Sequence, residues 1–173
     1  MGLADTERNR AAVHEAGHAL IAASRGLGVS VIELHDVDGD GGTRLSDRPQ
    51  ELDRVWVLYG GPFAEKVAFR KWQLAAITPE LDELLMAHSL CQKMEINTRE
   101  IMDQVEAYLR EHQDQLELIA TRLLEINTLH GAELDGLLGQ QTPSAPPPTG
   151  RSARWETVLG RRVSAVRMWR RAR

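Results

Sequence analysis

One short stretch, residues 13–19, constrains this chain more than any other, because it places two histidines four positions apart with a glutamate between them. On a helix, His14 and His18 lie on one face, a turn apart, where both imidazoles can reach a single tetrahedral Zn²⁺ ion. Glu15 lies about a third of a turn away from His14, where its carboxylate can reach a metal-bound water but not readily the metal. This spacing is typical of zinc peptidases in which the glutamate is the general base.

The residues on either side indicate that this stretch is helical. Thr6 can cap the first turn, Glu7 favours the positive end of the helix dipole, and Gly26 follows the last turn as a stop signal. The alternative is a helix that carries the two histidines and the glutamate by chance, because short motifs recur without function. The rest of the chain has to decide between these interpretations.

Composition indicates the class of protein. With 173 residues, 42% hydrophobic and 27% charged, the chain has the balance of a soluble globular protein with one domain and additional segments. No apolar run approaches the roughly 18 residues that a membrane span needs, and the N-terminal residues lack the pattern of a secretory signal, so a cytoplasmic protein is expected. The single cysteine, Cys91, excludes an internal disulfide and a thiolate zinc site. Any metal here would use nitrogen and oxygen ligands.

The charge is distributed unevenly. Residues 151–173 hold eight arginines and one glutamate, a net charge of +7, whereas the whole chain carries −4, so residues 1–150 carry −11. Apolar residues at helical spacing in the basic segment predict a short amphipathic helix, suited to an anionic membrane surface, nucleic acid or a protein partner. Docking on the acidic body of the same chain is the alternative. We therefore expect a zinc domain at 1–140, a proline-rich linker at 141–150 and the basic helix at 151–173.

Two strands are expected after the first helix. Residues 29–35 alternate in the manner of a strand, and residues 43–45 can pair with them through a turn rich in aspartate and glycine. Residues 36–47 also resemble a calcium loop, with carboxylates at the first, third, fifth and twelfth positions and Gly41 at the sixth. The twelfth residue is Asp47 instead of the usual glutamate, and strands replace the usual flanking helices. A solvated hairpin turn is therefore favoured over a calcium site.

Four further helices are predicted by the spacing of apolar residues, at 51–71, 78–96, 97–123 and 132–138. The first of these contains Gly60-Gly61-Pro62, where a kink or a break is expected because proline removes a hydrogen bond and disfavours helical geometry at the preceding residue. The fold class predicted is mainly α (α+β), a helical zinc-peptidase domain with a small β-hairpin after the metal-binding helix.

Two histidines leave a catalytic zinc ion one protein ligand short. Glu80 and Asp82, at the start of the helix predicted at 78–96, are the candidates. Steps of three and four residues from Glu80 reach an inward face that includes Ala87 and Cys91, whereas those from Asp82 reach a more mixed face. Glu80 is therefore preferred, with Asp82 as the alternative. Without a metal, both carboxylates would merely favour the helix dipole.

In this order, the segments resemble the zinc-peptidase domain of the FtsH-type ATP-dependent metalloproteases. The resemblance covers roughly residues 9–139 and rests on four segments: His14-Glu15-Ala16-Gly17-His18, Gly60-Gly61-Pro62-Phe63-Ala64-Glu65, Thr78-Pro79-Glu80-Leu81 and residues 123–133. In that family the third ligand is the aspartate of a Ser-Asn-Asp-Leu motif. Its position falls on Glu80, although Asp82 keeps the residue type.

The chain also departs from the family pattern. Pro62 replaces the usual arginine, and the segment between the third and fourth helices is shorter than in a typical member. No stretch resembles the phosphate-binding loop of an ATPase, so no ATP is expected. A stand-alone domain of this kind could cleave peptides, flexible segments or itself, or it could use the motor of a partner.

The sequence thus predicts a zinc metalloendopeptidase that acts on peptide or protein substrates, with Zn²⁺ held by His14, His18 and Glu80 or Asp82, and with Glu15 transferring the proton. Residues 29–34, if they form a free sheet edge, could hold an extended substrate by strand addition. The competing predictions are an inactive scaffold with the peptidase fold and an adaptor whose basic tail binds its target. A homo-oligomer, and peripheral attachment to a membrane through the tail, are further predictions that the sequence leaves open.

Overall fold

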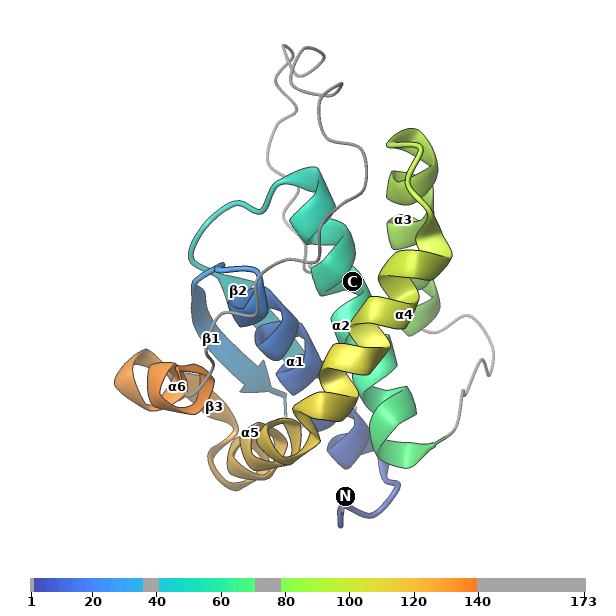
Figure 1. Cartoon of the computed structure of the whole chain (residues 1–173). Helices are drawn as coiled ribbons and strands as arrows, with labels where there is room; N and C mark the ends of the chain where they lie inside the picture. Colours follow the sequence, from blue (N-terminus) through green and yellow to red (C-terminus); the bar gives the residue numbers. More distant parts are fainter. Residues whose placement is uncertain (1, 36–40, 71–78, 140–173) are drawn as a thin grey trace, which may run out of the picture. The chain divides into compact units, whose positions relative to one another are not determined.

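The computed structural model describes residues 2–35, 41–70 and 79–139, and this part of the chain forms six helices and a three-stranded sheet (Figure 1). The helices are α1 (Glu7–Ser24), α2 (Glu51–Phe69), α3 (Pro79–Lys93), α4 (Thr98–Glu111), α5 (Gln113–Ile126) and α6 (Gly131–Leu138). The strands are β1 (Val29–Leu34), β2 (Gly41–Leu45) and β3 (Thr128–His130). The predicted fold class, mainly α with a small sheet, is confirmed.

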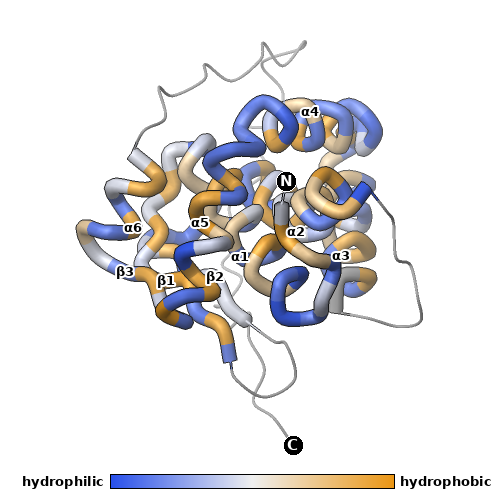
Figure 2. Tube along the Cα trace, turned by 90° about the horizontal axis from the view of Figure 1, so that it is seen from below, coloured by the Kyte–Doolittle hydropathy of each residue, from blue (hydrophilic) through white to orange (hydrophobic). Residues whose placement is uncertain are grey.

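Helix α1 forms the centre of the core. It begins as predicted, because the Thr6 hydroxyl accepts a hydrogen bond from the backbone N–H of Asn9 at 3.2 Å. Every residue from Ala12 to Ala22 is buried, which requires neighbours on all sides of the helix. Helix α2, helix α5 and the sheet supply those neighbours. In Figure 2 the outer turns of α4 are hydrophilic, whereas hydrophobic segments gather where α1, α5 and β1 adjoin.

Helices α1 and α2 approach each other through glycines. A side chain at Gly17 would collide with Ala64 and with the backbone of Gly60, so the two backbones lie in contact. The break considered at Gly60-Gly61-Pro62 does not occur: α2 is one helix that continues through Pro62. Gly61 has no Cβ for the proline ring to clash with, which lowers the cost of a helical residue before proline.

The sheet has the strand order β2-β1-β3, and both pairings are antiparallel. Strands β1 and β2 form the hairpin that the sequence predicts. Residues 36–40, which carry three of the four carboxylates of the suggested calcium loop, lie outside the described residues. Strand β3 was not predicted, because three residues are too few to show an alternating pattern. It makes β1 the central strand, so the free edge that substrate binding along β1 would require is not present.

The long helix predicted at 97–123 is two helices. Its start is confirmed, because the Asn97 side chain accepts a hydrogen bond from the backbone N–H of Arg99 at 3.1 Å. At His112 the backbone leaves the helical conformation, with φ −106° and ψ 27°, and the chain turns between α4 and α5 (Figure 1). Nδ1 of His112 lies 2.9 Å from the carbonyl oxygen of Tyr108, and the two rings stack. No glycine or proline marks this position, and the apolar spacing continues across it. The sequence pattern therefore predicts one helix where the structure has two.

The described residues contain no helix that is long and apolar enough to cross a bilayer. Helix α6 ends at Leu138, close to the predicted end of the domain at residue 140. The linker at 141–150 and the basic helix at 151–173 lie outside the described residues. The predicted division of the chain and the partners of the tail therefore stay predictions.

Candidate metal centre

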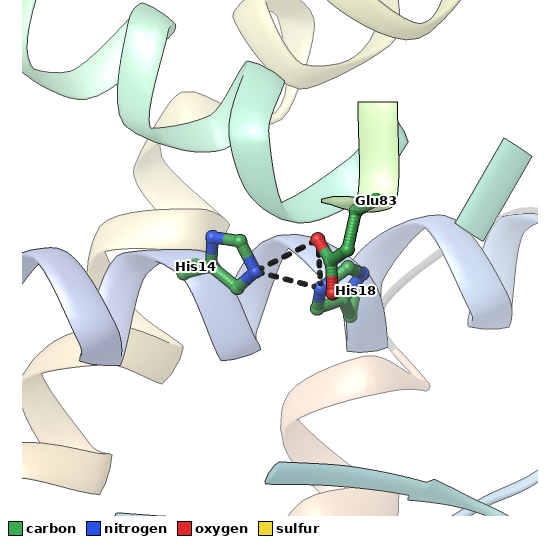
Figure 3. Close-up of side chains that lie close together, drawn as sticks. All are labelled: His14, His18 and Glu83. Atoms are coloured by element: carbon green, nitrogen blue, oxygen red, sulfur yellow. Dashed lines mark hydrogen bonds and ion pairs between the residues drawn. The ribbon is translucent and has the colours of Figure 1, made fainter. Parts of the chain in front are cut away.

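Three side chains from two helices converge: His14 and His18 of α1, and Glu83 of α3 (Figure 3). The Nε2 atoms of the two histidines lie 2.9 Å apart, and Oε2 of Glu83 lies 3.1 Å from Nε2 of His14 and 3.3 Å from Nε2 of His18. Ligand atoms held about 2.0–2.1 Å from a tetrahedral zinc ion are roughly 3.3 Å apart. The three atoms are thus spaced nearly as zinc ligands are, and slightly closer.

The other ring nitrogen of each histidine already has a partner on α2. Nδ1 of His14 lies 2.7 Å from Oε1 of Glu65, and Nδ1 of His18 lies 2.7 Å from the carbonyl oxygen of Val57. Carboxylate and carbonyl oxygens accept hydrogen bonds, so each Nδ1 carries the proton and donates it. The lone pair of each neutral imidazole is therefore on Nε2, where a metal would bind.

A cation fits between these three atoms. Oε2 of Glu83 is buried and, among the described residues, has no hydrogen-bond donor, although both Nε2 atoms lie within the distance of an ion pair. A buried carboxylate oxygen without a donor is costly, and so is the approach of two nitrogen lone pairs to it. A divalent ion satisfies all three atoms at once. Two imidazoles and a glutamate form one of the ligand sets of catalytic zinc sites, so the residues present fit Zn²⁺.

The pKa shifts agree with a site for positive charge. Burial alone would lower the pKa of His14 and His18, but the negative charge of Glu83 raises the pKa of both above the usual 6.5. Burial would raise the pKa of Glu83, yet the two histidines lower it far below the usual value for a glutamate. Either protons or a metal ion can therefore balance the buried carboxylate.

Helix α2 shapes the surroundings of His14. A Cβ atom at Gly61 would collide with Nε2 of His14, so the lack of a side chain there leaves room for the ring. Glu65, one turn further along α2, accepts from Nδ1 of His14 and also from Arg10, at 3.3 Å. Arg10 in turn pairs with Asp5. The segment from Gly60 to Glu65, which was singled out in the sequence, thus orients the first histidine.

Glu15 projects from the same helix toward the sheet. It is only 3% exposed, and its Oε2 accepts a hydrogen bond from the hydroxyl of Thr43 on β2 at 2.8 Å. Burial raises the pKa of Glu15, and the positive charge of the histidines and the hydrogen bond from Thr43 oppose that rise. A buried carboxylate with a raised pKa next to a candidate metal site has the properties of a general base.

The structure joins the two predicted histidines to a carboxylate that the sequence analysis did not name. Asp82 is exposed, and the side chain of Glu80 lies outside the described residues. Glu83 lies three residues after Glu80 and four before the buried Ala87, on the inward face that was traced from Glu80. A step of three residues from Glu80 along that face reaches Glu83.

A comparison with protein families gives an independent indication of the reaction class. Residues 10–89 match the family model described as Peptidase M50B-like. The match covers just under half of the chain and extends from α1 to α3, so it includes His14, Glu15, His18 and Glu83. No curated protein matches the chain. The match indicates a metallopeptidase-family domain, and it does not single out the FtsH type.

Proposed function

We propose that this protein is a zinc-dependent metallopeptidase related to the FtsH-type peptidase domain. His14, His18 and Glu83 would hold the ion, and Glu15 would be the general base. The observation that carries the proposal is the convergence of three electron-pair donors beside a buried glutamate. The match of residues 10–89 to a metallopeptidase family supports the reaction class.

Each side chain of the site has its own task. Zinc bound there would polarise the scissile carbonyl and lower the pKa of water to about 7. Glu15 would take a proton from the attacking water and deliver it to the leaving amine. The hydrogen bonds to Glu65 and to the Val57 carbonyl keep both histidines in the neutral tautomer that binds through Nε2. Glu83 would offset one of the two charges of the ion.

Strand β2 suggests how a substrate would bind. In the part of the chain that the structure describes it is an edge strand of the sheet, and its residue Thr43 contacts the side chain of Glu15. An extended peptide that adds to this edge as a further strand would run past the general base. We therefore propose peptides and flexible protein segments as substrates. Hydrolysis of a peptide bond by metal-activated water consumes no ATP, so the reaction as proposed needs no nucleotide.

The variant Glu15→Gln tests the proposal, because glutamine keeps the size of the side chain but cannot take the proton. We expect the wild-type zinc content, and hydrolysis of fluorescent casein or a mixed peptide library lowered by roughly 10²–10⁴-fold. Glu125→Gln, an exposed glutamate on α5, is the matched control and should behave as the wild type. Equal activity of Glu15→Gln and wild type would rule out the proposed mechanism.

A further inference from the structure

We propose that Thr43 is a positioning residue that holds one carboxylate oxygen of Glu15 and leaves the other to take the proton. The inference rests on the proposed function, in which Glu15 is the general base. Thr43 is 7% exposed, and its Oγ1 lies 2.8 Å from Oε2 of Glu15 and 3.0 Å from the backbone carbonyl oxygen of the same residue. One hydroxyl thus contacts both ends of the Glu15 residue, which restricts rotation of the side chain between them.

Gly41 provides the space for this arrangement. Residues 41 and 43 are two apart on β2, so they face the same side of the sheet. A Cβ atom at Gly41 would meet Cγ of Glu15 at 2.8 Å and the carbonyl oxygen of Glu33 at 2.9 Å, closer than such atoms can approach. Gly41 therefore accommodates the stem of the Glu15 side chain, while Thr43 holds its tip. Two positions of one strand fix where the carboxylate lies.

The proton count gives the two carboxylate oxygens different tasks. A threonine hydroxyl has one proton to donate, and an ionised carboxylate can only accept. The hydrogen bond from Thr43 holds Oε2 against β2, and the proposal assigns the proton from water to Oε1, the oxygen that Thr43 does not contact. After the transfer, Oε2 still accepts from the hydroxyl, because the new proton is on Oε1. Thr43 can therefore hold Glu15 in one orientation throughout the reaction.

A merely structural role for Thr43 makes different predictions, and a pair of variants separates the two. Thr43→Val keeps the shape of the side chain without the hydroxyl, and Thr43→Ser keeps the hydroxyl. For the zinc-loaded full chain, we expect kcat to fall roughly tenfold to a hundredfold in Thr43→Val, with KM and zinc content unchanged, and to stay within about threefold of wild type in Thr43→Ser. A lower Tm in Thr43→Val with an unchanged kcat would overturn the positioning role.

Crystal structures of the same zinc-loaded proteins provide a readout that does not depend on activity. The Glu15 carboxylate should keep its conformer in the wild type and in Thr43→Ser, and it should rotate away in Thr43→Val. An unmoved carboxylate in Thr43→Val would refute the inference even where hydrolysis falls. A wild type that hydrolyses no peptide would refute the proposed function alone, since the response of the Glu15 conformer to the two Thr43 variants would still decide the positioning role.

Discussion

The two helices of the candidate site hold their side chains in different ways. On α1, His14 and His18 each have a second hydrogen-bond partner on α2, and the two helices are in backbone contact at Gly17 and Gly60. On α3, Oε2 of Glu83 has no hydrogen-bond donor among the described residues, and it lies 3.1 Å and 3.3 Å from the Nε2 atoms of the two imidazoles. The histidines are thus oriented by hydrogen bonds to α2, whereas Oε2 of Glu83 has no such partner in the described part of the chain.

This difference predicts how each helix responds to a metal. The hydrogen bonds of the histidines do not involve the Nε2 atoms, so both rings should keep their orientation with or without zinc. Glu83 needs either protonated imidazoles or a metal ion to balance its charge. Zinc should therefore link α3 to α1, and its binding energy should stabilise the folded state.

The largest effect is expected from removing the charge of Glu83. In Glu83→Gln the zinc affinity should fall by more than the roughly 10–100-fold that loss of an outer hydrogen bond causes, because a charged ligand is lost. Asp82→Asn, at the preceding and exposed position, is the matched control and should bind as the wild type does. Competition with a chromophoric chelator measures both affinities. A large loss in Asp82→Asn or Glu80→Gln, with Glu83→Gln unaffected, would assign the third ligand to that residue.

Gly61→Ala tests whether the packing of α2 against α1 holds His14 in its orientation. Its Cβ atom would collide with Nε2 of His14, so we expect zinc binding to be lost and Tm to fall as α1 and α2 separate. Gly136→Ala on α6 is the control, because a Cβ atom there meets no atom within 4 Å. That change should stabilise the helix by up to about 1 kcal/mol. Wild-type zinc affinity in Gly61→Ala would show that His14 is not held in this orientation.

Glu65→Gln weakens the hydrogen bond that orients His14 and leaves the proposed metal ligands unchanged. The amide can still accept from Nδ1 of His14, but it lacks the charge that strengthens the hydrogen bond. We expect a loss of zinc affinity within the range of roughly 10–100-fold. Glu125→Gln again is the control. A loss as large as that of Glu83→Gln would place Glu65 among the ligands themselves and would remove the distinction between the two helices.

The smallest effect is a shift in pH dependence. Zinc must displace protons from His14 and His18, so its affinity should fall as the pH decreases below their pKa. Because Glu83 raises the pKa of both histidines, this fall should begin at a higher pH than an ordinary histidine pKa of 6.5 would give. In Glu83→Gln the histidine pKa should drop, and the onset should move to lower pH. An onset that does not move would mean that Glu83 does not set the charge of the histidines.

The same comparison explains how much of the site the sequence could predict. His14, Glu15 and His18 belong to one helix, so helical periodicity alone brings them to adjacent faces. The glycines and Glu65 of α2 also stood out in the sequence, although their contacts with His14 did not. Local spacing therefore accounts for the α1 half of the site and the hairpin beside it.

The position of Glu83 at the site depends on tertiary packing and not on local spacing. Which face of α3 meets α1 is decided by the rotation of one helix against another, and steps of three and four residues leave neighbouring positions equally acceptable. The turn at His112 contains no glycine or proline, and strand β3 is too short to show a period, so neither had a clear local signal. β3, the element that the sequence did not reveal, makes β2 rather than β1 the edge strand beside Glu15.

Zinc-anomalous diffraction tests the central claim most directly. Crystals of the full chain grown with zinc, measured on both sides of the zinc absorption edge, should show one anomalous peak about 2.0–2.2 Å from Nε2 of His14, Nε2 of His18 and a carboxylate oxygen of Glu83. A peak at the histidines with Glu80 or Asp82 in place of Glu83 would contradict the ligand set. The absence of any peak between the two histidines would contradict the account as a whole.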